Sequence, residues 1–185
     1  MAFIVDASVA GAWLLPDEDH PFAAEMMNQL ADEDAVAPEL LQHEMRSILL
    51  IAAKRGRIGE DMVYTALSRF RALPLRLVTR IEDSEVIRVA RRHQLSAYDA
   101  AYLALTLAEG VPLATLDRKL AGAARAEGAI VLGPLAHGHR QPSNTNTIAR
   151  GGTRYDRGCL ADEPPRQAGR SLDRSGCRSP APSGQ

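Results

Sequence analysis

The sequence predicts an α/β fold in which a central parallel sheet of about five short strands is covered by helices on both faces. Short apolar runs alternate with longer segments of helical periodicity through residues 1–133. Most of these runs are apolar throughout, which is typical of strands buried on both faces of a sheet. Strands that are separated by helices pair in parallel through crossover connections, so the order of the segments favours a parallel sheet.

The five predicted strands lie at residues 3–5, 35–37, 75–78, 112–115 and 129–132. Seven segments predict helices, at residues 8–15, 20–30, 38–56, 60–72, 82–93, 97–109 and 118–127. We expect Pro16 to end the first helix and Gly56 to end the third. We also expect Pro38 to begin the third helix, because the fixed φ of proline suits the first helical position.

Composition limits the classes of protein to consider. The chain has 185 residues and is 45% hydrophobic, which is enough for one domain with a core. No apolar run approaches the roughly 20 residues of a membrane span. Because Asp6 interrupts the first apolar run and no basic segment precedes it, we expect a cytoplasmic protein without a signal peptide. Cys159 and Cys177 form no CxxC pair, so neither a zinc site nor a disulfide framework is indicated.

The chain changes character near Gly133. Up to that point the net charge is −5, whereas residues 134–185 carry +4 and contain few large apolar residues. We therefore expect a folded domain at 1–136 and a disordered tail, rich in Arg, Gly, Pro and Ser, at 137–185. An acidic domain does not hold nucleic acid by bulk charge, so any RNA contact requires a local basic rim around an acidic centre.

Four carboxylates fall where such a fold binds ligands, outside the carboxyl ends of the strands. Asp6 ends the first strand and Asp117 follows the fourth, while Glu44 and Asp99 lie in early turns of two helices. Each also has a structural interpretation. Asp6 and Asp117 are favoured N-cap residues, and Asp99 closes an S-x-x-D capping pattern that begins at Ser96. A solvated helix residue is the corresponding interpretation of Glu44.

Glu44 fits its structural interpretation least well. We interpret it as lying on an apolar stripe of its helix, formed by Leu40, Leu41, Ile48 and Ile51. Asp99 also has apolar neighbours at helical spacing, namely Tyr102, Leu103 and Leu107. An unpaired carboxylate drawn toward a core costs several kcal/mol, of the order of the usual penalty for a buried charge. A divalent cation relieves both this cost and the mutual repulsion of the acids. Oxygen ligands of this kind suit Mg²⁺ or Mn²⁺.

The segments FIVDAS at 3–8, PELLQHEM at 38–45, SAYDAAYLALTLAEG at 96–110 and LATLDRKLAGAARAEG at 113–128 identify a family resemblance. Over residues 1–133 the chain resembles the PIN-domain ribonucleases, most closely the VapC toxins of VapBC toxin–antitoxin modules. The resemblance implies a PIN-like three-layer α/β/α sandwich. It also implies that Asp6, Glu44, Asp99 and Asp117 form the catalytic quartet.

Within that quartet, the resemblance gives Asp6 and Asp99 as direct metal ligands and Glu44 and Asp117 as further candidates. Ser8 and Thr115 match supporting hydroxyl positions. One departure is Ser47, which stands where the family often has Asn three residues after the glutamate. Arg118 and Lys119 adjoin Asp117 and are our candidates for contact with RNA phosphate.

The implied function is that of a Mg²⁺-dependent endoribonuclease toxin that cuts RNA, including tRNA, and is inhibited by a VapB-like antitoxin. A homodimer is the implied assembly. The alternatives are a stand-alone PIN nuclease and a non-catalytic PIN-like module that binds RNA. A haloacid-dehalogenase-type phosphatase is disfavoured because Ser8 replaces its second aspartate, and a receiver domain leaves Asp99 and Asp117 unexplained.

Overall fold

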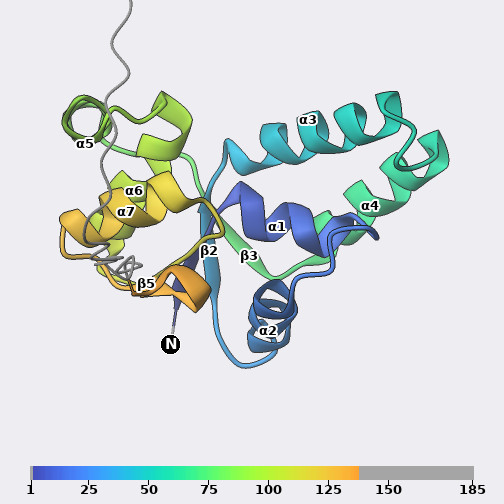
Figure 1. Ribbon diagram of the computed structural model, residues 1–185, viewed down its shortest axis with the longest axis horizontal. Coiled ribbons are helices and arrows are strands. Elements are labelled where there is room, and N and C mark those ends of the chain that lie inside the picture. Colours follow the sequence, from blue (N-terminus) through green and yellow to red (C-terminus); the bar gives the residue numbers. More distant parts are fainter. Residues whose placement is uncertain (1, 138–185) are drawn as a thin grey trace, which may run out of the picture. The chain divides into compact units, whose positions relative to one another are not determined.

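The computed structural model describes residues 2–137, and within them it confirms the predicted parallel α/β fold (Figure 1). The sheet order is β3-β2-β1-β4-β5, and every pair of neighbours is parallel. Apart from His137, the predicted tail lies outside the described residues. The strands are β1 (Phe3–Val5), β2 (Ala35–Pro38), β3 (Leu75–Val78), β4 (Leu113–Ala114) and β5 (Val131–Leu132).

All seven expected helices are present, with ends that differ from the expected ones by at most three residues. They are α1 (Ala7–Leu14), α2 (Pro21–Gln29), α3 (Leu41–Lys54), α4 (Glu60–Ala72), α5 (Asp83–His93), α6 (Ala97–Glu109) and α7 (Arg118–Ala126), and a short 3-10 helix, η1 (Gly133–Leu135), follows β5. Within residues 2–137, no helix is long and apolar enough to cross a membrane.

Helices cover both faces of the sheet. Figure 1 shows α1 to α4 on one side of the strands and α5 to α7 on the other. Every residue of β1, β2 and β4 is buried, as the apolar runs predicted. Because β1 lies at the centre of the sheet, Asp6 emerges from the middle of its carboxyl edge, between the ends of β2 and β4.

The expectation for Pro38 is wrong. Pro38 is the last residue of β2, where it pairs with Val78 of β3, and α3 begins only at Leu41. The amide of Glu39 still donates to the Val78 carbonyl, at 2.9 Å. Amides alternate in direction along a strand, so the ring nitrogen of Pro38 faces β1, whose pairing with β2 ends at Val36. A proline can occupy a strand where no ladder hydrogen bond is required of it.

The core consists mainly of small and aliphatic side chains, and Tyr102 is the largest side chain that is almost fully buried. Gly133, with φ of +83°, ends β5 against α2. A Cβ at this position would lie 2.5 Å from the ring of Phe22, so only glycine allows this close approach.

Candidate active site at the carboxyl ends of the strands

Asp6 is the best-anchored residue of the site. Its carboxylate is 4% exposed. The Oδ1 atom accepts hydrogen bonds from the amides of Ser8 and Val9, both at 3.1 Å, and from the Ser8 hydroxyl at 2.6 Å. The Oδ2 atom accepts from the Thr115 hydroxyl at 2.6 Å. Asp6 is therefore the N-cap of α1, as its structural interpretation predicted, and it is also held from β4.

Ser8 and Thr115 connect Asp6 to the loop after β4. The Ser8 hydroxyl accepts from the amide of Leu116 at 2.8 Å, and the Thr115 hydroxyl accepts from the amide of Asp117 at 2.9 Å. Each hydroxyl thus donates to Asp6 and accepts from the loop that carries Asp117. A hydroxyl has one donor and two acceptor positions, so each of these hydroxyls uses its donor and one acceptor. The ends of β1 and β4 are thereby fixed to each other.

Glu44 enters the site from the first turn of α3. Its Oε2 atom accepts a hydrogen bond from the hydroxyl of Tyr102, on α6. In the sequence, Tyr102 is recognisable only as an apolar neighbour of Asp99, and nothing there identifies its hydroxyl as a polar contact of the site. A tyrosine one turn after Asp99 was a weak signal for this contact, because residues three apart lie on one side of a helix.

The prediction that Glu44 lies on the apolar face of its helix is partly wrong. The buried positions of α3 are Leu41, Met45, Leu49 and Ala52. Glu44 lies at the edge of this face and is partly buried, whereas Ile51 is 45% exposed. The carboxylate therefore borders the core and the solvent together, a position from which it can reach a polar ligand.

Asp99 and Asp117 complete the group from two further helix starts. Ser96 caps α6: its hydroxyl accepts from the Asp99 amide at 3.0 Å and donates to Asp99 Oδ2 at 2.8 Å. Asp117 caps α7 by accepting from the Leu120 amide through Oδ1, at 2.7 Å. The capping interpretations are thus confirmed as contacts. They leave the other oxygen of each carboxylate without a hydrogen bond from any residue in 2–137.

All four carboxylates lie at helix N-termini, those of α1, α3, α6 and α7. The positive end of each helix dipole faces the carboxylate in its first turn, which favours the charged form. This arrangement explains how one edge of a small sheet carries four acids. It compensates only part of their repulsion, because the dipole interaction is worth about 0.3–1 kcal/mol in each case.

Two of the four carboxylates, Asp6 and Glu44, have raised pKa values. Burial raises the pKa of Asp6, its hydrogen bonds lower it, and the charge of Asp117 raises it further. Burial also raises the pKa of Glu44, against the hydrogen bond from Tyr102, and the charges of Asp6 and Asp99 add to the increase. The site is thus a connected group of acids whose negative charge is not balanced.

No cation of the described part of the chain balances this charge. The ion pairs found among residues 2–137 all lie elsewhere. Lys119 donates instead to the carbonyl of Gln94, and Arg118 is exposed. These two candidates for RNA contact therefore flank the carboxylates without neutralising them.

The donor set fits a hard divalent cation. Oxygens without hydrogen bonds from residues 2–137 remain on Glu44, Asp99 and Asp117, and Asp6 Oδ2 accepts only the bond from Thr115. Excess negative charge is what such a cation compensates. Within residues 2–137, no three acidic, His or Cys side chains are close enough to enclose a metal by themselves. A cation at this edge of the sheet would need water or substrate oxygens to complete its coordination.

Comparison with known proteins agrees with the residue pattern. The PIN domain family model matches residues 3–126. Ribonuclease VapC3 of Pyrobaculum aerophilum is 31% identical over 65% of this chain and 93% of its own length. Ribonuclease VapC9 of Mycobacterium tuberculosis is 34% identical over 71% of this chain and 98% of its own. A crystal structure of VapBC2 from Rickettsia felis, bound to a promoter DNA fragment, has a TM-score of 0.52 at 11% identity, covering 71% of this chain and 98% of that one.

Proposed function

Since this chain belongs to the PIN domain family, we propose that it is a Mg²⁺-dependent endoribonuclease and the toxic component of a type II toxin–antitoxin pair. The observation that carries the proposal is the group of four carboxylates, Asp6, Glu44, Asp99 and Asp117, at the carboxyl edge of the sheet without a cation from residues 2–137. The VapC ribonucleases among the relatives support the same reaction.

In this proposal Asp6 and Asp99 hold Mg²⁺ or Mn²⁺, and Glu44 and Asp117 complete the set of oxygens. When bound, such a cation supplies the positive charge that makes water a nucleophile near neutral pH and stabilises the oxygens of a phosphodiester under attack. The hydroxyls of Ser8 and Thr115 hold the Asp6 carboxylate through one hydrogen bond each, and each hydroxyl is itself fixed by an amide of the loop after β4. Asp6 therefore requires little reorganisation when it binds the metal.

Glu44 is suited to orient the attacking water and to accept its proton. Tyr102 fixes its Oε2 atom, which leaves Oε1 for the water. A raised pKa makes the ionised carboxylate a better proton acceptor, because base strength increases with pKa. Asp117 is the second candidate for this role, since its Oδ2 atom is also not used in capping α7. Neither role requires a ribose hydroxyl as the nucleophile.

The proposed partner is a small VapB-like antitoxin that covers residues 8–72 and inserts a basic side chain among the carboxylates. The unbalanced charge of the site supports this choice, and so does the VapBC2 structure among the structural neighbours. A homodimer is the proposed assembly. Co-purification with the product of an adjacent small gene tests the partner; without an inhibitory partner, a stand-alone PIN nuclease becomes the better description.

The experiment for the activity is cleavage of total cellular RNA by the purified chain, with mapping of the ends. We expect cleavage with Mg²⁺ or Mn²⁺, none with EDTA, and 5′-phosphate and 3′-hydroxyl ends, because water and not a ribose hydroxyl attacks. Cleavage that persists in EDTA would refute the metal-dependent mechanism. Binding of RNA without cleavage under any of these conditions would favour the non-catalytic module.

A further inference from the structure

The end of α5 and the start of α7 meet beside the candidate active site. Lys119, in the first turn of α7, donates its ammonium group to the carbonyl of Gln94, the residue that ends α5. Gln94 has a φ of 53°, which turns the chain sharply toward Ser96, the cap of α6. Basic side chains at the end of α5 are therefore only a few residues from Asp99, and those of α7 directly follow Asp117.

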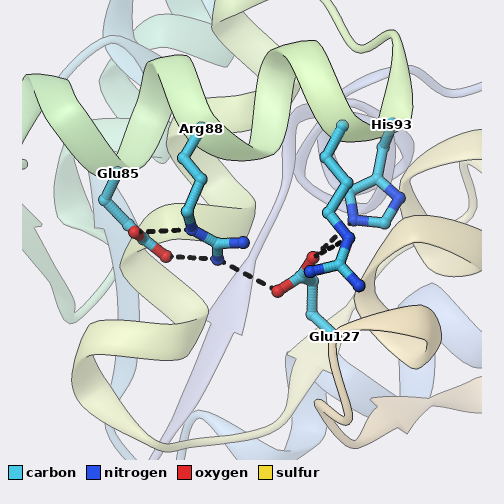
Figure 2. A network of polar contacts seen from close by, with 5 residues as sticks. Glu85, Arg88, His93 and Glu127 are labelled. Carbon is cyan, nitrogen blue, oxygen red and sulfur yellow. Dashed lines mark hydrogen bonds and ion pairs between the residues drawn. The ribbon is translucent and has the colours of Figure 1, made fainter.

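Several of these cations are available for a ligand. Arg91 and Arg118 are exposed and form no ion pair with any residue in 2–137. The side chain of Arg92 is 61% exposed and contacts Glu127 at 3.4 Å through Nε alone. Lys119 is exposed and bonded to a carbonyl, not to an acid. By contrast, Arg88 is shared between Glu85 and Glu127 (Figure 2).

Glu127 fixes the end of α5 next to α7. Its side chain is 9% exposed and accepts from Arg88 at 3.0 Å and from His93 at 2.6 Å (Figure 2). Because Glu127 directly follows α7 and Lys119 lies in its first turn, these contacts and the bond from Lys119 to Gln94 hold both ends of α7 against the C-terminal half of α5. The neighbouring cations are thereby held on a rigid support.

We propose that Arg91, Arg92, Arg118 and Lys119 form a basic patch that binds phosphates of single-stranded RNA on one side of the bond to be cut. The inference rests on the proposed nuclease function and assigns part of its substrate site. Residues 1–133 carry a net charge of −5, and the carboxylates repel phosphate. A substrate must therefore be held by cations beside the acids, and this patch adjoins two of the four carboxylates.

The alternative interpretation is that these cations are solvated side chains at helix ends and bind no ligand. Cations near the C-terminus of α5 interact favourably with its dipole, and this accounts for the position of Lys119 without a ligand. It does not account for Arg118, which lies in the first turn of α7, where the dipole disfavours a positive charge. Arg118 is thus the residue whose removal separates the two interpretations, and Arg91, which the dipole of α5 also accommodates, is removed with it because it too forms no ion pair with any residue in 2–137.

The test is the Arg91→Ala/Arg118→Ala double variant, with Arg69→Ala/Arg71→Ala as the matched control. The control removes two exposed arginines from α4, on the other side of the sheet (Figure 1). Binding of a fluorescent single-stranded RNA of about 20 nucleotides is measured by anisotropy at several salt concentrations, with Ca²⁺ in place of Mg²⁺ and again with EDTA. Thermal unfolding confirms that both variants are folded.

Each phosphate contact contributes about 0.7 to the slope of log K against log salt for single strands. We therefore expect the slope of the double variant to fall by about 1.4 and its Kd to rise about 25-fold at 0.1 M salt, with the control unchanged. Equal losses in both variants would show a bulk charge effect and overturn the patch. So would RNA binding that is unaffected, or absent from the wild-type protein in both conditions.

The result is independent of the cleavage assay. If the double variant binds RNA weakly and the wild-type chain does not cut, the patch stands and the nuclease proposal fails. If the wild-type chain cuts and the double variant binds and cuts equally well, the nuclease stands and the patch is overturned. An acidic protein partner is then the better candidate for this surface.

Discussion

Glu127 and the four-carboxylate site are two acidic regions of the same domain with opposite surroundings. The neighbours of Glu127 are Arg88, Arg92 and His93, and their hydrogen bonds and charges lower its pKa to about 2. Figure 2 shows this carboxylate enclosed by side chains of α5. The neighbours of Asp6 and Glu44 are hydroxyls, amides and other acids, and their pKa values are raised, first of all by burial.

The difference separates an acid whose charge is compensated within the described part of the chain from acids whose charge is not. Glu127 finds its compensating charges within the chain, so its interactions are complete when the domain folds. Asp6 has many hydrogen bonds but no cation, and further acids add to its charge. A perturbed acid near other acids, at a place where folds of this class bind ligands, is a candidate for function. A substitution in the four-carboxylate site should therefore reduce RNA cleavage and leave stability intact, whereas a substitution of Glu127 should reduce stability and leave cleavage intact.

The largest expected effect is that of Asp99→Asn on RNA cleavage. Asparagine keeps the size of the side chain and an oxygen that can accept from Ser96, but it removes a charge. At metal sites, substitution of a residue that only orients a metal ligand already costs about 10–100-fold in affinity or activity. Loss of a direct ligand should therefore reduce cleavage by more than about 100-fold, measured with single-stranded RNA and Mg²⁺. The unfolding midpoint of the metal-free protein should stay unchanged or rise, because repulsion with Glu44 is relieved.

Glu25→Gln is the matched control, since Glu25 is exposed on α2 and forms no ion pair with any residue in the described part of the chain. It should change neither cleavage nor stability. Normal Mg²⁺-dependent cleavage by the Asp99→Asn protein would refute the metal site. A loss of cleavage accompanied by a large loss of stability would instead indicate that Asp99 acts mainly through the cap of α6.

The reverse pattern is expected for Glu127→Gln. The glutamine has a similar shape but no charge, so Arg88, Arg92 and His93 lose their common partner. Because Arg92 is well exposed and Arg88 keeps Glu85, we expect a loss of about 1–2 kcal/mol in the free energy of unfolding. For a domain of this size that lowers the unfolding midpoint by roughly 3–6 °C. Cleavage below the transition should stay close to that of the wild type; a loss of cleavage at unchanged stability would contradict the structural role.

The strands and helices could be predicted because each depends on local patterns. The apolar runs placed all five strands, and the caps of α6 and α7 were visible in the sequence at Ser96 and Asp117. Pro38 was placed wrongly because a proline can both start a helix and end a strand. Only the pairing of β2 with β1 and β3 shows that no amide is needed there.

The four acids could be proposed as one group from the topology, since parallel strands end at the same edge of a sheet. The side chains that bond to acidic residues of the domain could not be predicted in this way. The bond from Tyr102 to Glu44 spans 58 residues, and the contacts of Glu127 with α5 span 34 to 39. No periodicity encodes such distances. The same limit affected Glu44, whose apolar neighbours in the sequence did not specify whether it faced the core or the edge of the core.

The smallest expected effect, and the sharpest test of the contrast, is the dependence of stability on pH. Glu127 has a lowered pKa, so its stabilisation is present above the ordinary value of 4.5 and is lost as the pH falls toward about 2. Asp6 and Glu44 have raised pKa values, so their contribution is present below the ordinary values of 3.8 and 4.5 and is lost as the pH rises. In EDTA the unfolding midpoint should therefore fall as the pH rises above these ordinary values.

Mg²⁺ should reverse only that loss. A cation at ten times its Kd adds about 1.4 kcal/mol to the stability of the folded state. The increase should grow as the pH rises and shrink as the pH falls toward the ordinary carboxyl pKa values, because protons then compete for the same oxygens. Thermal unfolding of the wild-type, Asp99→Asn and Glu127→Gln proteins, with and without Mg²⁺, separates the regions. Asp99→Asn should lose the response to Mg²⁺, whereas Glu127→Gln should keep it and lose only the acid-sensitive part of its stability. A wild-type protein that becomes steadily more stable in EDTA as the pH rises above these ordinary values would contradict the charge imbalance on which the site rests.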